Sequence, residues 1–152
     1  MLTPKPLFPG ARVALVAPSG PVPQGRLEPA VKSVENLGLE PVVFESCRSK
    51  HGYFAGSDQL RTDDINQAFA DQTIDGVICI RGGYGAQRLM KLIDFGCIRR
   101  NPKYFSGYSD VTALHIKINQ SCGFVTYHTP MPATELYNGA DEFSVEQVKK
   151  TL

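Results

Sequence analysis

The sequence has almost no net charge, no long apolar run and no apolar leader. Its 16 Lys and Arg residues nearly balance 15 Asp and Glu residues, which leaves a formal charge of +1. It therefore lacks the field that attracts nucleic acid or a membrane surface, and we expect neither partner. The longest apolar runs, such as ARVALVA and DGVICI, are far too short to span a bilayer. The opening segment MLTPKPLFPG has no apolar core like that of a secretory signal, so we expect a cytoplasmic protein.

Cysteine is scarce and follows no pattern of a metal site or a disulfide framework. The four cysteines (Cys47, Cys79, Cys97 and Cys122) form no CxxC pair and have no zinc-ligand spacing. Cys79 and Cys122 lie in or beside apolar runs. We therefore expect buried, reduced thiols, as in a cytoplasmic protein.

Short apolar runs alternate with helical patterns along the 152 residues, a length sufficient for one domain. The apolar runs are continuous rather than alternating, as in strands that are buried on both faces. We expect strands at residues 12–17, 41–45, 75–81, 103–108 and 123–128, and helices at residues 24–37, 58–71, 86–94 and 110–120. This rhythm predicts an α/β fold, a parallel sheet with helices on both faces, of the flavodoxin-like or glutamine-amidotransferase-like kind.

The chain ends in DEFSVEQVKKTL, a helical pattern that stops soon after it starts. Ser144 and Gln147 have the spacing of a capping box, and Val145, Val148 and Leu152 fall on one helical face. Two interpretations remain open at this point. Either the segment is a frayed terminal helix, or the chain is a fragment of a longer protein.

The segment RGGYG follows the third expected strand, at the edge of the sheet where ligands bind in such folds. Gly82, Gly83 and Gly85 are able to take positive φ and leave their backbone N–H groups accessible. A helix that starts directly after them would direct further free donors into the same crevice, which favours an anion. The segment is neither a dinucleotide fingerprint nor a Walker A loop, because Arg88 replaces the last glycine and no Gly-Lys-Ser/Thr follows. A tight turn without a ligand is the alternative.

The segment GYSD follows the fourth expected strand in the same way. A sharp strand-to-helix turn would expose the Ser109 hydroxyl at the edge of the sheet, as in a nucleophile elbow, although the G-x-S-x-G pattern is absent. The N–H of Asp110 would then be the first oxyanion donor. The alternative is that Ser109 or Asp110 is only the N-cap of a helix.

A serine nucleophile needs a base, and none of the three histidines is a convincing one. His51 lies in a long loop, and His115 is six residues beyond Ser109, on another face of the expected helix. His128 ends the fifth expected strand at the correct edge of the sheet. There it could bind substrate or stiffen the loop.

Five segments, in order along nearly the whole chain, resemble the N-terminal domain of the serine L,D-carboxypeptidases. They are ALVAPSGPV, HGYFAGSDQLRTDDINQAFAD, IDGVICIRGGYGAQRLMKLIDF, NPKYFSGYSDVTALH and GFVTYHTPM. This family comprises the muramoyltetrapeptide carboxypeptidases and the microcin C immunity peptidases. The RGGYG form is typical of the murein-peptide enzymes, whereas Thr129 stands where many members have glycine.

The resemblance implies that Ser109 is the nucleophile and that the N–H groups of Asp110 and Gly83 form the oxyanion hole. The substrate-binding residues that we expect are Gly82, Tyr84 and His128. The resemblance places the catalytic Glu and His in a C-terminal domain beyond Leu152. Residues 1–152 would then be the nucleophile-bearing domain of a two-domain peptidase and inactive alone. No metal or organic cofactor is implied.

The implied reaction is acyl transfer in cell-wall recycling in the cytoplasm. Ser109 would attack the bond between the L-centre of a diamino acid and the terminal D-alanine of a murein tetrapeptide, while the His takes its proton and the Glu orients the His. We expect the full-length protein to be a homodimer. Two alternatives remain open: cleavage of a peptidyl-nucleotide of the microcin C type, and a non-catalytic flavodoxin-like module that binds an anion. A downstream domain with a Glu and a His would separate the peptidases from the binding module.

Overall fold

The computed structural model describes all 152 residues, and its centre is a five-stranded parallel sheet. The strands are β1 (Arg12–Val16), β2 (Glu40–Val43), β3 (Gly76–Cys79), β4 (Tyr104–Gly107) and β5 (Tyr127–His128). Their order across the sheet is β2-β1-β3-β4-β5, and every adjacent pair is parallel. The predicted α/β fold is confirmed, and the strand order is that of flavodoxin-like folds.

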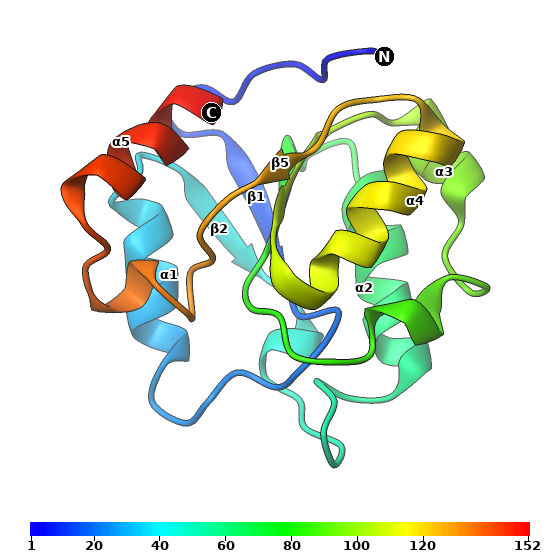
Figure 1. The fold of residues 1–152 in the computed structure, drawn as a ribbon, viewed down its shortest axis with the longest axis horizontal. Coiled ribbons are helices and arrows are strands. Elements are labelled where there is room, and N and C mark those ends of the chain that lie inside the picture. The colour runs from blue at the N-terminus through cyan, green and yellow to red at the C-terminus, as the bar shows by residue number, and fades with distance from the viewer.

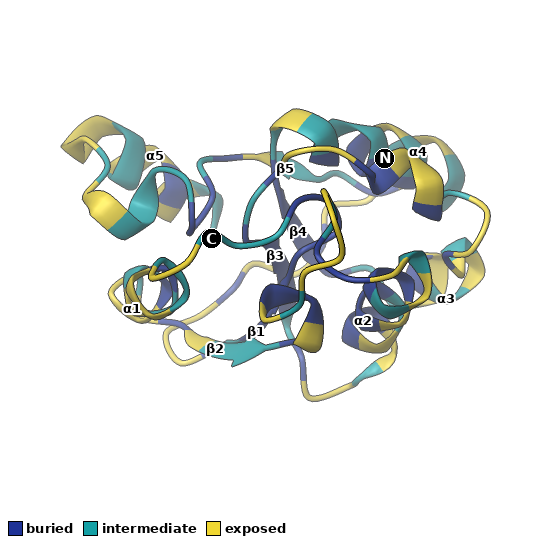
Figure 2. Cartoon of the chain, turned by 90° about the horizontal axis from the view of Figure 1, so that it is seen from below, coloured by how far each residue is buried: buried dark blue, intermediate teal, exposed yellow.

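Helices cover both faces of the sheet (Figure 1). The first face carries α1 (Leu27–Glu35) and α5 (Glu142–Thr151). The second face carries α2 (Asp58–Ala70), α3 (Phe95–Arg100) and α4 (Thr112–Cys122). Figure 2 shows the buried strands β1, β3 and β4 between these two layers of helices, whereas the edge strand β2 is only partly buried.

The sheet separates two apolar cores, which explains why its strands are continuously apolar. Val13 and Leu15 of β1 belong to the core beneath α1, whereas Ala14 and Val16 belong to the core beneath α2 and α4. Successive side chains of a strand point to opposite faces, so a strand that is covered on both sides needs an apolar residue at every position.

The structure differs from the prediction after the glycine loop, residues 82–85. A helix is predicted over residues 86–94, but the structure has only a 3-10 turn at Ala86–Leu89, followed by the separate helix α3 that the sequence did not indicate. Asp94 begins α3, because its side chain accepts the N–H of Cys97 at 2.8 Å. The N–H of Asp94 is in turn held by Asn66 Oδ1. The glycine loop therefore lacks the long helix, and the dipole, that the prediction assumed.

Two smaller predictions are wrong. Ser144 and Gln147 do not form a capping box, because Asp141 is the N-cap of α5 and accepts both the N–H and the hydroxyl of Ser144. β5 is also much shorter than residues 123–128. The predicted N-cap of α2 is confirmed, since Ser57 Oγ accepts the N–H of Leu60 at 3.1 Å.

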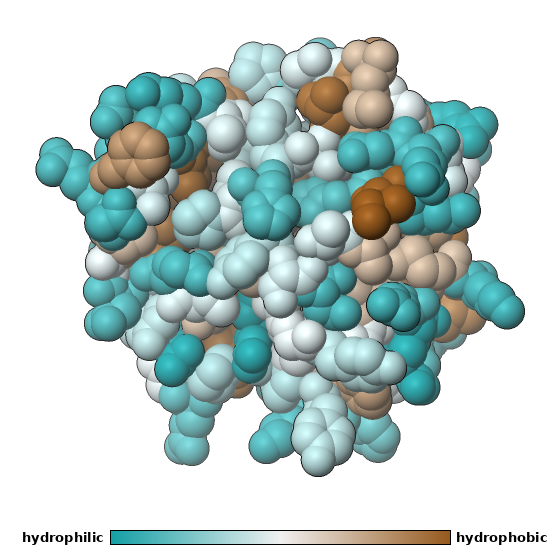
Figure 3. All heavy atoms as spheres, viewed as in Figure 1, coloured by the Kyte–Doolittle hydropathy of each residue, from teal (hydrophilic) through white to brown (hydrophobic).

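The surface is polar and mixed, with large hydrophobic side chains scattered over it (Figure 3). None of the helices has both the length and the apolar character that crossing a bilayer requires. All four cysteines are free; Cys47 and Cys79 are buried, and Cys97 and Cys122 are half-buried.

Candidate active site

Ser109 occupies a strained turn at the carboxyl edge of the sheet. β4 ends at Gly107, and Ser109 begins a 3-10 turn (Ser109–Val111) that leads directly into α4. Its φ is +64°, and it is the one non-glycine residue of the chain with positive φ. This conformation costs an L-residue about 1–2 kcal/mol and is typical of nucleophile elbows. The side chain is exposed.

Gly82 lies directly against Ser109. A Cβ on Gly82 would be 2.9 Å from the Ser109 Cβ and 3.1 Å from its Oγ, so a side chain would not fit there. Gly83 and Gly85 have φ of +121° and +123°, whereas Gly82 does not take positive φ. The N–H of Gly83 makes no hydrogen bond within the chain. A free backbone donor therefore lies one residue from the contact with the serine.

The loops after β1, β3 and β4 are joined to one another. The N–H of Gly20, after β1, donates to the carbonyl of Gly82, after β3, at 3.0 Å. Asp110, after β4, accepts the N–H of Ala86 on its Oδ2 at 2.8 Å. Asp110 therefore caps the turn that follows the glycine loop, and neither it nor Ser109 caps α4 through a side chain.

Arg61 ties the same loops together from within the protein, and the sequence analysis missed it. Its side chain is fully buried, and Nη1 donates to the carbonyls of Pro18 at 2.5 Å and Gly85 at 3.2 Å. Nη2 pairs with Asp58 at 2.5 Å. A signal was present in the sequence, because Arg61 precedes Ile65 by four residues and so lies on the apolar face of α2.

Asp58 is shared between two arginines. Arg88 pairs with it at 2.7 Å, and hydrogen bonds from Arg88, together with the nearby Arg61, lower the pKa of the Asp58 carboxyl. Both guanidinium groups lie over the ring of Phe54, with their central carbons 4.9 and 5.1 Å from its centroid. A Cβ on Gly85 would be 2.7 Å from this ring, so the glycine loop packs closely on the cluster.

None of the three histidines makes a hydrogen bond with the Ser109 hydroxyl. His115 is buried, and its Nε2 makes a hydrogen bond with the carbonyl of Gly107 at 2.9 Å, not with the serine hydroxyl. Burial lowers the pKa of His115. His128 is exposed, with its ring 5.7 Å from the ring of Tyr108, and makes no ion pair with an acidic residue. His51 lies in the loop after β2, where it pairs with Phe54 through backbone bonds.

A small cavity of about 300 Å³ lies beside Tyr108 and His128. Tyr108 donates a hydrogen bond from its hydroxyl to Glu135, which also accepts the N–H of Met131 at 3.0 Å and the hydroxyl of Thr134 at 2.6 Å. Burial acts to raise the pKa of Glu135, but the bonds from Thr134 and Tyr108 lower it overall. Three hydrogen bonds therefore hold the Glu135 carboxylate and fix the loop after β5.

A larger cavity, of about 620 Å³, lies between the loops after β1 and β3. The strand order reverses between these two strands, which is where open α/β sheets bind ligands. The predicted residues Gly83 and Tyr84 line this cavity, together with Gly20, Pro21, Lys50 and Arg81. His128 does not line it, so the structure places Tyr84 and His128 in different cavities.

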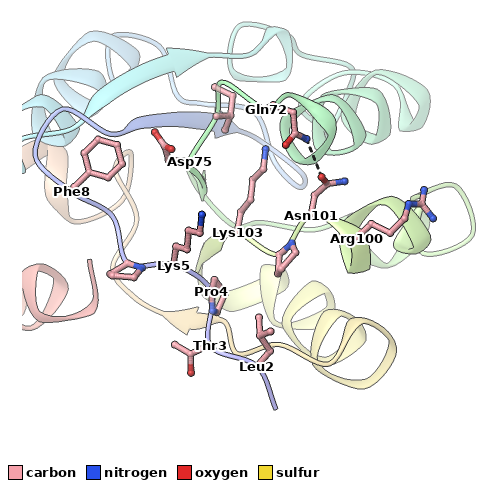
Figure 4. A pocket seen from close by; sticks show the side chains of 13 residues that line it. Leu2, Thr3, Pro4, Lys5, Phe8, Gln72, Asp75, Arg100, Asn101 and Lys103 are labelled. Carbon is pink, nitrogen blue, oxygen red and sulfur yellow. Dashed lines mark hydrogen bonds between the residues drawn. The ribbon is translucent and has the colours of Figure 1, made fainter.

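Another cavity, of about 480 Å³, opens at the opposite, amino-terminal edge of the sheet (Figure 4). Lys103 points into it, and its ammonium group donates to the carbonyls of Ala68 and Asp71. This cavity is far along the strands from Ser109. No group of three or more His, Cys, Asp or Glu side chains is placed to hold a metal ion anywhere in the chain.

Known proteins are similar to this chain in both sequence and fold. Residues 13–129 match the LD-carboxypeptidase N-terminal domain family. A Bacillus subtilis protein named "Probable murein peptide carboxypeptidase" is 41% identical over 133 residues, which are 88% of this chain and 42% of that protein. The murein tetrapeptide carboxypeptidase of Pseudomonas aeruginosa is 32% identical over 104 residues, which are 68% of this chain and 34% of that protein.

Solved structures agree with this relationship. An MccF-like protein from Bacillus anthracis has a TM-score of 0.92 and 28% identity, with 100% of this chain and 47% of that one covered. A muramoyltetrapeptide carboxypeptidase from Oxalobacter formigenes has a TM-score of 0.83 and 29% identity, with 93% and 47% covered. The chain spans less than half the length of these relatives. The matched residues include Ser109 and the whole glycine loop, and the chain belongs to the LD-carboxypeptidase family as an N-terminal domain.

Proposed function

We propose that the full-length protein is a serine L,D-carboxypeptidase that releases the terminal D-alanine of murein tetrapeptides. The observation that carries this proposal is the positive φ of Ser109 beside Gly82, with the free N–H of Gly83 one residue away. An exposed hydroxyl on a strained turn next to free backbone donors is the arrangement of a nucleophile elbow. The names of the Bacillus subtilis and Pseudomonas aeruginosa relatives support murein peptides as the substrate class.

The proposed reaction has two acyl-transfer steps. The Oγ of Ser109 attacks the carbonyl carbon of the bond to D-alanine, a base accepts its proton, and the carbonyl oxygen becomes an oxyanion. The N–H groups of Gly83 and Asp110 stabilise that oxyanion. Collapse of this tetrahedral intermediate breaks the bond to the nitrogen of D-alanine, and the leaving amine takes the proton from the base. Water then hydrolyses the ester and restores the serine.

The base and its orienting carboxylate are proposed to lie in the part of the family's length that this chain does not cover. His115 is already bonded to Gly107, and His128 has no acidic partner. Residues 1–152 are then the nucleophile-bearing domain of a two-domain enzyme. Without a base, this domain should release D-alanine orders of magnitude more slowly than the full-length protein.

The test is D-alanine release from a murein tetrapeptide by the full-length protein. Ser109→Ala should lower kcat by at least about 10³-fold, because the nucleophile is removed. Ser33→Ala is the matched control, since Ser33 lies in α1 and bonds only the carbonyl of Ala30. A Ser109→Ala enzyme with wild-type turnover would refute Ser109 as the nucleophile. A full-length wild type that releases no D-alanine would favour the non-catalytic module that binds an anion.

A peptidyl-nucleotide of the microcin C type is the second candidate substrate. The likeness to the MccF-like protein from Bacillus anthracis supports it. The ratio of kcat/KM for the two substrates, measured on one enzyme preparation, decides between them. We also propose cytoplasmic action in cell-wall recycling and a homodimer for the full-length protein, which cell fractionation and light scattering respectively will test.

A further inference from the structure

The cavity between the loops after β1 and β3 carries positive charge and no acidic side chain. Its cations are Arg81, directly before the glycine loop, and Lys50, from the loop after β2. Neither forms an ion pair with any carboxylate in the chain. The other arginines of this edge differ, because Arg61 and Arg88 both pair with Asp58.

Arg81 is held in place while part of its guanidinium group remains unused. Nη1 donates to the carbonyl of Pro21 at 2.7 Å, and Nε is buried without a partner. Nη2 makes no hydrogen bond within the chain and lies 3.9 Å from the position that a Cβ on Gly83 would take. A partly buried cation with unpaired donors is stabilised by an anion that accepts hydrogen bonds from it.

The position of this cation relative to Ser109 defines which anion fits. Gly82 contacts Ser109, Gly83 offers the free N–H, and the guanidinium of Arg81 lies beside Gly83. In a peptide that is cleaved at its last bond, the terminal carboxylate carbon is three bonds from the scissile carbonyl carbon, about 4 Å at most. The carboxylate therefore has to lie beside the same loop as the oxyanion.

We propose that Arg81, with Lys50 as a second cation, binds the terminal carboxylate of the leaving amino acid. The inference rests on the proposed role of Ser109 and adds the group that restricts cleavage to the last bond of a peptide. Planar guanidinium groups bind carboxylates through two parallel hydrogen bonds, which fixes the orientation of the leaving residue as well as its charge. The exposed rings of Tyr53 and Tyr84 border the cavity and leave it open to solvent.

The experiment compares two peptides on the full-length protein: a tetrapeptide with a free terminal D-alanine, and the same peptide as its C-terminal amide. The wild type should cleave the free acid about 10- to 100-fold faster in kcat/KM. Arg81→Met should remove most of this preference by slowing only the acid. Lys50→Met should reduce the preference for the acid less, because Lys50 is exposed to solvent. For the same reason, this substitution should leave the fold intact. Arg100→Met, which removes an exposed cation at the opposite edge, is the control.

Equal cleavage of acid and amide by the wild type would overturn the inference while leaving the serine peptidase intact. So would an Arg81→Met enzyme that slows both peptides alike. Binding gives a readout that does not depend on turnover: millimolar D-alanine should raise the melting temperature of the wild type, D-alaninamide should not, and Arg81→Met should abolish the shift. If the protein cleaves neither peptide but shows these shifts in melting temperature, the proposed function is refuted and the carboxylate site is supported. A protein that shows neither would refute both.

Discussion

The positive φ of Ser109 predicts that glycine at this position will stabilise the protein. At a φ of +64° an L-residue is strained by about 1–2 kcal/mol, and glycine is not. Glycine also loses more chain entropy on folding, by about 0.5–1 kcal/mol. Ser109→Gly should therefore be more stable than Ser109→Ala by about 0.5–1 kcal/mol, because alanine keeps the strain and both remove the hydroxyl.

Urea unfolding of the full-length protein measures this difference as a shift of the midpoint at constant slope. In melting experiments it corresponds to about 1–4 °C. Ser33 in α1 gives the opposite control, since in a regular helix glycine is less stable than alanine by about 1 kcal/mol. If Ser109→Gly is no more stable than Ser109→Ala, the turn holds no strain, and the structural argument for an elbow is refuted.

Three further predictions follow from the loops around Ser109. Gly83→Val should lower kcat about 100-fold while circular dichroism shows that the fold is retained, because a Cβ at Gly83 would be 3.0 Å from Gly20 and the φ of Gly83 is +121°. Gly38→Ala is the control, since a Cβ at Gly38 would contact nothing. An unchanged kcat in the Gly83→Val enzyme would exclude the glycine loop from catalysis. Arg61→Met should destabilise the protein by about 3 kcal/mol in urea, since it leaves two buried carbonyls without their donor and Asp58 with Arg88 alone. Exposed Arg88→Met should cost about 1 kcal/mol or less, and equal losses would contradict the role of Arg61 in joining the loops. Because the pKa of Asp58 is lowered in the folded state, the unfolded state binds a proton first as pH falls, so the stability that this carboxylate contributes is present above about pH 4 and lost below it. In Asp58→Asn the urea midpoint should therefore depend less on pH over that acidic range. The same pH dependence as in the wild type would contradict the pairing.

Much of the fold was predictable because the apolar runs and the helix caps in the sequence match the strands and helices that the structure buries. Continuous apolar runs mark strands that are covered on both faces, and Ser57 marks the start of α2. The segment after the glycine loop was not predictable in the same way. Its apolar spacing fits one long helix, but Asp94 bonds to Cys97 and to Asn66 and starts a new one. Such choices depend on partners that are distant in sequence.

The site was predictable in position and not in detail. The strand-to-helix pattern located Ser109 at the edge of the sheet, beside the glycines. The positive φ of Ser109 could not be deduced, because serine rarely adopts it. The contacts of Arg61 with Pro18 and Gly85 join residues 43 and 24 positions away, and no local pattern reports contacts of that range.

The hydrogen bonds that join the three loops also limit how this edge of the sheet can evolve. Because Gly20 is bonded to Gly82 and Asp110 to Ala86, the effect of a substitution in one loop depends on the residues that the other loops already carry. The side chains of Tyr53 and Tyr84 take no part in these hydrogen bonds, and the two residues are 87% and 62% exposed. Substitutions at these two exposed rings are therefore expected to leave Ser109 in place, whereas substitutions in the joined loops are expected to be coupled to one another.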